Sequence, residues 1–96
     1  MKLPPQNLEA EESVLGSLMI DKEAIIRVTD ILHPADFYKS ANGKIYEAIL
    51  NLFEKNQPID ILSVTNALQE QGRLTDVGGP VYLSQLIERV PTSSHV

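Results

Sequence analysis

The sequence predicts an all-α fold, a compact orthogonal bundle of about five to six short helices. Apolar residues recur at helical spacing along the whole chain, and residues that start or stop helices flank each of these stretches. No stretch alternates apolar and polar residues as a half-buried strand does. Because spacing, start signals and stop signals agree, the all-α prediction rests on several independent features.

The first half of the chain holds two predicted helices and a turn. Asn7 is expected to cap the first helix, whose apolar stripe runs from Val14 to Met19. Asp21 is expected to cap a second helix, which ends at His33 because Pro34 disfavours helical geometry before it. The stretch PADFY then predicts one short turn, anchored by its two aromatic side chains. The inner side of the second helix is expected to consist of Ile25, Val28, Ile31 and Leu32.

Three further helices are predicted in the second half. Ser40 begins the longest helix, and Asn56 supplies a left-handed residue at its end. Asp60 caps the next helix, and Gly72 is its C-terminal residue. The last full helix begins near Pro80. The predicted core residues are Ile45, Ile49, Leu52 and Phe53 in the longest helix, Ile61, Val64, Thr65 and Leu68 in the next, and Tyr82, Leu83, Leu86, Ile87 and Val90 in the last.

Composition excludes several classes of function. The chain has no cysteine, which excludes disulfides and thiol catalysis and fits a reducing compartment. Its 13 acidic and 8 scattered basic residues give a net charge of -5, so the isolated chain is expected to bind nucleic acid poorly. Glu9, Glu11 and Glu12 are interpreted as a solvated helix N-terminus, not a cation site. No apolar run approaches the ~18 residues of a membrane span, and no secretory signal begins the chain, so no membrane partner is expected.

The most unusual stretch is TDVGGPVYLSQL, where two glycines and a proline precede an apolar helical run. A P-loop needs a lysine and a hydroxyl-bearing residue after its last glycine, and neither is present here. The stretch YKSANGKI lacks the first glycine and the hydroxyl of the same motif. Pro80 instead fits the first position of a helix, with Gly79 as N-cap and Gly78 allowing a sharp turn. These three residues are therefore expected to have a structural role.

No catalytic arrangement is evident elsewhere. The two histidines are far apart and lack metal-ligand spacing to acidic residues, and His33 is interpreted as a turn residue. Asp36 and Tyr38 could form a small acid–base site. A turn in which Asp36 caps and the aromatic rings pack explains the same residues more simply. The residues by themselves therefore predict an acidic helical interaction module without catalytic groups.

Seven motifs, taken together, resemble one protein family. They are LPPQNLEAEESVLGSLMID (residues 3–21), DFY (36–38), IYEAI (45–49), PIDILSV (58–64), GRL (72–74), VGGPVYL (77–83) and VPT (90–92). In this order and spacing they resemble the N-terminal domain of the bacterial replicative DNA helicase, the DnaB family. The resemblance covers essentially the whole chain. Asn42 stands where many family members carry a histidine, at a position that is not catalytic in the family.

This resemblance implies that residues 1–96 form one helical collar domain without enzymatic activity, cofactor or metal. In the family, a RecA-like motor domain that uses ATP and Mg²⁺ follows in the same polypeptide, and residues 92–96 would begin the next helix. Family proteins form hexamers, commonly trimers of dimers, around a channel for single-stranded DNA. The collar docks primase and, in some lineages, a helicase loader. A bacterial cytoplasm is implied, although algal plastids also encode this family.

The last helix is the predicted partner-binding element. Tyr82 is expected to contact primase together with Gln85 and Arg89, its hydroxyl staying in water while its ring packs. Tyr82 also lies at the edge of the apolar stripe, so a simple core role is the alternative. For the whole chain, the alternative function is a free-standing helical adaptor that binds primase or loader without a motor. A small acid–base enzyme around Asp36 and Tyr38 is a third hypothesis, which lacks a nucleophile and a cofactor motif.

Overall fold

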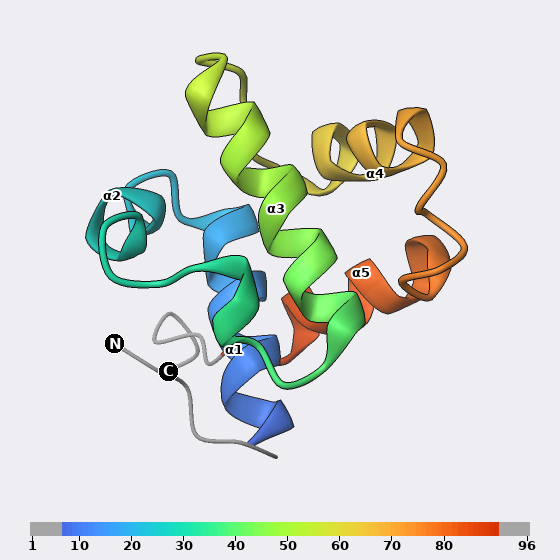
Figure 1. Ribbon diagram of the computed structural model, residues 1–96, viewed down its shortest axis with the longest axis horizontal. Helices are drawn as coiled ribbons and strands as arrows, with labels where there is room; N and C mark the ends of the chain where they lie inside the picture. Colours follow the sequence, from blue (N-terminus) through green and yellow to red (C-terminus); the bar gives the residue numbers. More distant parts are fainter. Residues whose placement is uncertain (1–6, 91–96) are drawn as a thin grey trace, which may run out of the picture.

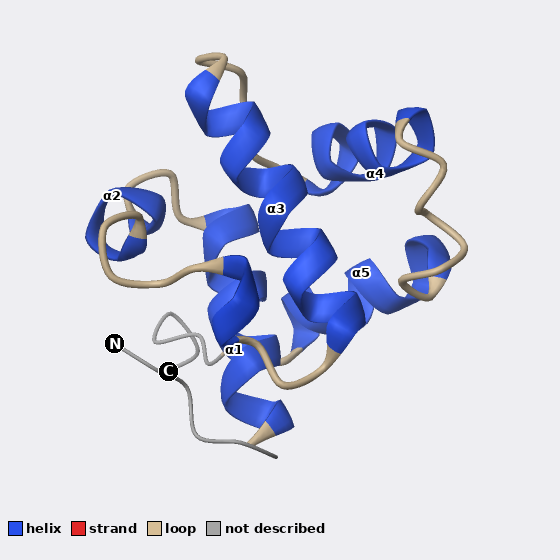
Figure 2. Cartoon of the chain, in the orientation of Figure 1, coloured by secondary structure: helices blue, strands red, loops and turns tan. Residues whose placement is uncertain are grey.

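Helices make up almost all of the regular structure in residues 7–90, the part of the chain that the computed structural model describes (Figure 1). They are α1 (Leu8–Ile20), α2 (Ala24–Val28), the short 3-10 helix η1 (Pro34–Asp36), α3 (Ser40–Glu54), α4 (Ile61–Glu70) and α5 (Gly79–Glu88). No strand occurs among these residues (Figure 2). The predicted all-α class and the predicted number of helices are therefore confirmed.

Helices α1 and α3 form the centre of the bundle, and the other helices surround them (Figure 1). Helix α5 packs mainly against α1, and α4 packs mainly against α3. Helix α2 lies against α1 on the side away from α4 and α5. The first and the last described helices are thus neighbours in space, which brings the two ends of the described chain onto one side of the molecule.

The predicted helix boundaries of α1, α3 and α4 are confirmed by their capping residues. The side chains of Asn7 and Asp60 each accept a hydrogen bond from the backbone N–H three residues later, at 3.1 Å and 2.8 Å. These bonds satisfy N–H groups that have no partner inside the helix. At the other ends, Asn56 and Gly72 have φ values of 57° and 73°, the left-handed geometry that stops α3 and α4.

The second helix is shorter than the sequence predicts. Helix α2 has 5 residues and ends at Val28, well before the predicted end at His33. Asp21 does not cap this helix as expected: it is the C-cap of α1, its carboxylate accepts the N–H of Glu23, and Glu23 is the N-cap of α2. After Val28 the chain forms a turn in which the N–H groups of Ile31 and Leu32 both donate to the Val28 carbonyl, so the apolar spacing alone overestimates this helix. Ile31, predicted to face inward, is 44% exposed.

The turn before α3 has one buried anchor instead of two. Residues 34–36 form η1, and the Asp36 carboxylate accepts the N–H of His33 at 2.9 Å, as a capping residue does. Phe37 is 7% exposed and packs against the ring of Tyr46, with 5.3 Å between ring centroids. Tyr38 is 59% exposed, so the prediction that both aromatic rings anchor the turn is wrong for Tyr38.

Helix α5 begins one residue earlier than predicted. Gly78 precedes the helix as its N-cap, with a φ of 113°, and Gly79 is the first helical residue by hydrogen bonding. Gly79 nevertheless has a φ of 74°, so both glycines adopt the left-handed region that side chains disfavour. Pro80 stands in the first turn, where its missing N–H leaves no hydrogen bond unmade. The N-cap is therefore Gly78 and not Gly79 as expected, and both glycines supply backbone geometry for the turn into α5.

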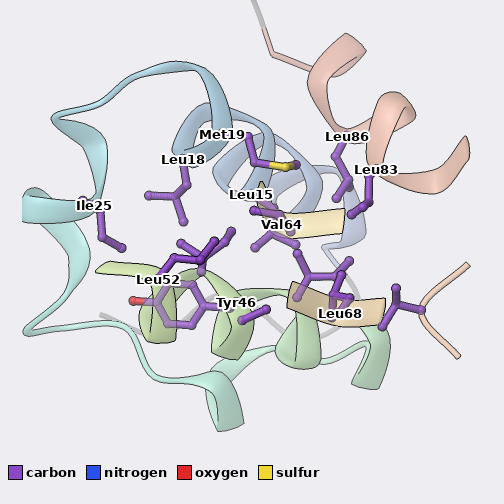
Figure 3. Close-up of a cluster of buried hydrophobic side chains, with 14 of the residues drawn as sticks. Leu15, Leu18, Met19, Ile25, Tyr46, Leu52, Val64, Leu68, Leu83 and Leu86 are labelled. Carbon is purple, nitrogen blue, oxygen red and sulfur yellow. The ribbon is translucent and has the colours of Figure 1, made fainter. Parts of the chain in front are cut away.

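One hydrophobic core joins the helices (Figure 3). Side chains from α1, α3, α4 and α5 meet in it, and those with no exposed area include Leu15, Ile45, Ile49, Val64, Leu68, Leu83 and Leu86. Tyr46 is fully buried as well, and its hydroxyl donates a hydrogen bond to the carbonyl of Leu32 at 2.8 Å. The core therefore fixes the inner side of α5, whereas Val81, Ser84, Gln85 and Glu88 on its outer side are exposed.

Candidate partner-binding face

Tyr82, Gln85 and Arg89 lie on one side of α5, because residues three and four positions apart are neighbours on a helix surface. We call these three residues the α5 face. Gln85 and Arg89 are exposed, and Tyr82 is half-buried. Next to Gln85 and Arg89, the side chains of Glu12 and Glu88 complete a shallow depression of about 420 Å³. Gln85 and Arg89 thus line this depression, whereas Tyr82 lies one turn earlier on α5 and outside it.

Arg89 connects the end of α5 to α1. Its Nε lies 2.9 Å from Oε1 of Glu12, and its guanidinium lies 3.7 Å from a carboxylate oxygen of Glu9. The carbonyl of Arg89 also accepts a hydrogen bond from the Ser13 hydroxyl at 3.5 Å. Because the Arg89 side chain is 52% exposed, these ion pairs add little to stability. They orient the guanidinium while leaving part of it accessible.

Gly16 allows α1 and α5 to approach each other closely. A Cβ atom at this position would lie 2.1 Å from the carbonyl oxygen of Leu86 and 2.6 Å from a methyl group of Val90. No side chain fits in that space, since the nearest atom belongs to the backbone of α5. The position of the α5 face relative to α1 therefore depends on a glycine in the middle of α1.

Glu11 is fully buried, so the interpretation of this residue as part of a solvated helix N-terminus is wrong. Its carboxylate accepts hydrogen bonds from the backbone N–H groups of Tyr38 and Lys39 and from Nδ2 of Asn42, the last at 2.8 Å. These N–H groups stand at the start of α3, where the helix dipole favours a negative charge. Glu11 therefore caps α3 from another helix. The Glu12 side chain is also mostly buried, at 15% exposed, and pairs with Arg89, so the solvated interpretation holds only for Glu9, which is 82% exposed.

Asn42 links Glu11 to Tyr82 through two hydrogen bonds. It is fully buried, and its Oδ1 accepts a hydrogen bond from the Tyr82 hydroxyl at 2.6 Å. The expectation that the Tyr82 hydroxyl stays in water is therefore wrong. The Lys39 ammonium lies 4.3 Å from the centre of the Tyr82 ring, within the range of a cation–π interaction. Tyr82 thus belongs both to the interior and to the α5 face.

The surroundings of Tyr82 keep its hydroxyl protonated. Burial, followed by the negative charge of Glu12, raises the pKa of Tyr82 to about 12. The hydrogen bond to Asn42 and the positive charge of Arg89 lower this pKa, and the charge of Glu11 raises it. The hydroxyl therefore stays protonated, and can donate to Asn42, to a more alkaline pH than that of an ordinary tyrosine.

The candidate acid–base residues have structural partners. His33 lies at the surface, with Nδ1 3.6 Å from the Asp36 carboxylate that caps the same turn. Among residues 7–90, no three His, Asp or Glu side chains are grouped as metal ligands would be. His95 lies outside the described residues. No helix in the described part of the chain is both long and apolar enough to cross a membrane.

Comparison with known proteins places this fold in a family. The family model described as the DnaB-like helicase N terminal domain matches residues 3–96. The chain belongs to this family. It is similar to the replicative DNA helicase DnaB of Geobacillus stearothermophilus, with 40% identity over 95 residues. A similar protein of the same name from Synechocystis is 43% identical over 94 residues.

These DnaB relatives are much longer than this chain. The matched regions cover 99% of this chain but 21% of the Geobacillus protein, and 98% of this chain but 11% of the Synechocystis protein. The chain is also similar in structure to the N-terminal domain of DnaB helicase from Mycobacterium tuberculosis. The TM-score is 0.89 at 44% sequence identity, over 94% of this chain and 65% of that chain. The helical fold is therefore shared with a crystal structure of the DnaB family.

Sequence reasoning did not identify Glu11 and Asn42 as members of the site. A signal for Glu11 was present, because it precedes Leu15 and Leu18 at helical spacing and so lies on the apolar side of α1. A charged residue in that position requires buried partners. The partners themselves are 27 to 31 residues away in the sequence. No local pattern in the sequence indicates which distant groups would meet it.

Proposed function

We propose that this chain is the non-catalytic collar domain of a hexameric replicative DNA helicase. The collar supports assembly of the hexamer, a trimer of dimers, and docks primase or a helicase loader. A motor domain in the same polypeptide binds ATP and Mg²⁺ and unwinds the duplex. The observation that carries this proposal is the match of residues 3–96 to helicase N-terminal domains, together with relatives that are replicative DNA helicases several times longer.

The α5 face is the surface that we assign to primase. Two of its side chains are exposed, and the guanidinium of Arg89 is held in place by Glu12 at 2.9 Å. A partner that binds such a surface loses little free energy in ordering it, which favours specific association. Tyr82 supplies an aromatic ring that is partly accessible next to these polar groups, as interface anchors do.

The charge of the chain also fits a collar. With a net charge of -5, its surface repels the phosphates of nucleic acid. Single-stranded DNA that passes through the ring would therefore not adhere to the collar, and the motor would be free to translocate. The similar proteins named above come from bacteria, so we place this protein in a bacterial cytoplasm.

A binding experiment with primase tests the docking role. Purified primase from the same organism is titrated into this chain and into the variants Tyr82→Ala, Gln85→Ala and Arg89→Ala by isothermal calorimetry. We expect each variant to bind at least about 5-fold more weakly. The control variant is Leu62→Ala on α4, whose side chain is 67% exposed on a different helix, and it should bind like the wild type. Unchanged binding by all three α5 variants would remove the α5 face from the proposal.

The reading frame of the source gene tests the collar role against the adaptor alternative. A P-loop and a RecA-like domain encoded beyond residue 96 would support a helicase collar. A stop codon directly after residue 96 would instead favour a free-standing adaptor. The predicted start of the next helix at Thr92 lies outside the described residues, so it remains part of this proposal.

A further inference from the structure

Three side chains from three helices form one continuous chain of hydrogen bonds in the interior, which we call the polar bridge. Glu11 of α1 accepts a hydrogen bond from Nδ2 of Asn42 on α3, at 2.8 Å. Oδ1 of the same Asn42 accepts the hydroxyl of Tyr82 on α5, at 2.6 Å. Glu11 and Asn42 have no exposed area at all. The bridge thus runs from the centre of the bundle to the beginning of the α5 face.

The backbone hydrogen bonds at the beginning of α5 are local: the N–H of Gly78 donates to the Thr75 carbonyl at 3.1 Å, and that of Gly79 to the Leu74 carbonyl at 2.9 Å. Both glycines are left-handed, and the next two residues, Pro80 and Val81, are exposed. Leu83 contributes apolar burial, which is favourable but does not depend on direction. A hydrogen bond to Tyr82 depends strongly on angle and distance, so it restricts the rotation of this turn in a way that apolar packing does not.

We propose that Asn42 is the positioning residue of the α5 face, and that the polar bridge fixes Tyr82 and the first turn of α5 in the geometry that a bound partner requires. This inference rests on the proposed function, because it takes the α5 face to be the primase surface. Asn42 is too deeply buried to touch a partner itself. Its effect on binding therefore passes through Tyr82.

The chemistry of the bridge requires a side chain at position 42 that donates one hydrogen bond and accepts another. The carboxylate of Glu11 can only accept, so the NH₂ group of Asn42 must face it, and the carbonyl oxygen must then face Tyr82. An aspartate would lack the donor and would place a second carboxylate beside Glu11. An apolar residue would remove one of the three donors to the Glu11 carboxylate and would take away the acceptor of the Tyr82 hydroxyl. On the other side of Tyr82, the Lys39 ammonium covers the ring at 4.3 Å and limits its movement.

Three variants separate positioning from general stability. Asn42→Ala removes the centre of the bridge, and Tyr82→Phe removes one hydroxyl while keeping the ring. Tyr46→Phe is the matched control, because it also deletes a buried tyrosine hydroxyl bond, to the Leu32 carbonyl, but outside the bridge. Binding of each variant to purified primase is measured by calorimetry at a temperature where all are folded. We expect Asn42→Ala and Tyr82→Phe to bind about 3- to 10-fold more weakly and Tyr46→Phe to bind like the wild type.

Hydrogen exchange of the backbone amides provides a readout that needs no partner. In Asn42→Ala and Tyr82→Phe, the amides of α5 should exchange about tenfold faster than in the wild type, relative to those of α4. In Tyr46→Phe, this ratio should not change. An unchanged ratio in the two bridge variants, or equal loss of binding in all three variants, would overturn the inference. If wild-type protein does not bind primase, the proposed function fails, and the exchange ratios alone decide whether the bridge positions α5.

Discussion

At the scale of single residues, the most consequential feature is a carboxylate in the core. Burying a charge is costly unless hydrogen bonds replace its lost water. Glu11 meets this condition with three N–H donors, two of them from the backbone at the start of α3. The backbone N–H groups at the start of α3 need an acceptor, and the Glu11 carboxylate needs donors, so each provides the hydrogen bonds that the other lacks. The residue thus connects α1 to α3 through contacts that apolar side chains could not provide.

Glu11→Gln should destabilise the fold more than most substitutions that keep the size of the side chain. The amide keeps the size of the side chain but loses the charge and turns an NH₂ group toward groups that are themselves donors. We expect the free energy of unfolding to fall by about 2–3 kcal/mol, measured by urea titration at pH 7. The control is Glu9→Gln, whose side chain is 82% exposed and should change stability by less than about 0.5 kcal/mol. Equal stability of the two variants would contradict a capping role for Glu11.

At the scale of helices, the sequence predicts best where a local signal decides. Asn7, Asp60, Asn56 and Gly72 each act within a few residues, and each marks a helix end as expected. Helix α2 is shorter than predicted because its apolar spacing continues beyond Val28, whereas the chain turns at that residue. Where a segment has no local stop signal, tertiary packing decides its helix end, and apolar spacing does not indicate that position.

Gly16→Ala tests the close contact between α1 and α5. In an exposed helix, replacing glycine by alanine stabilises by up to about 1 kcal/mol. Here the added methyl group would lie 2.1 Å from a backbone oxygen of α5, so the helices must separate. We expect the opposite sign, a loss of about 3 kcal/mol in thermal or urea unfolding. A variant as stable as the wild type would show that α5 can move away from α1 without lowering the free energy of unfolding.

Pro80→Ala tests the start of α5. Pro80 is exposed, and its ring serves mainly to restrict the unfolded chain and to favour the first helical turn. We expect the free energy of unfolding to fall by about 1 kcal/mol or less, measured by urea titration. A loss of several kcal/mol would mean that the proline ring makes packing contacts which its exposure does not indicate.

At the scale of the whole molecule, the contacts that unite the bundle join residues far apart in the sequence. Tyr82 and Asn42 are separated by 40 positions, and Ser13 and the Arg89 carbonyl by 76. Helical spacing predicts that Tyr82, Gln85 and Arg89 share one side of a helix. It does not predict that Tyr82 also reaches a buried asparagine, because that contact depends on how α5 crosses the bundle. The arrangement of these three residues along α5 could therefore be predicted from the sequence, but the hydrogen bonds that join Tyr82 to the interior could not.

The raised pKa of Tyr82 predicts a loss of stability of the whole fold in alkaline solution. An unfolded tyrosine ionises with a pKa near 10, whereas the folded value is about 12. The stabilisation from the neutral hydroxyl is therefore fully present below pH 10 and is lost as the pH rises through 12. Because the ring is only half-buried and solvent screens part of the effect, we expect a loss of about 1 kcal/mol between pH 8 and pH 11. Burial also raises the pKa of Tyr46, which adds to the loss in the same direction.

The measurement is urea unfolding at both pH values for the wild type and for Tyr82→Phe, which cannot ionise at this position. If both proteins lose the same stability, Tyr82 titrates as an ordinary tyrosine and its hydroxyl is not held inside the bundle.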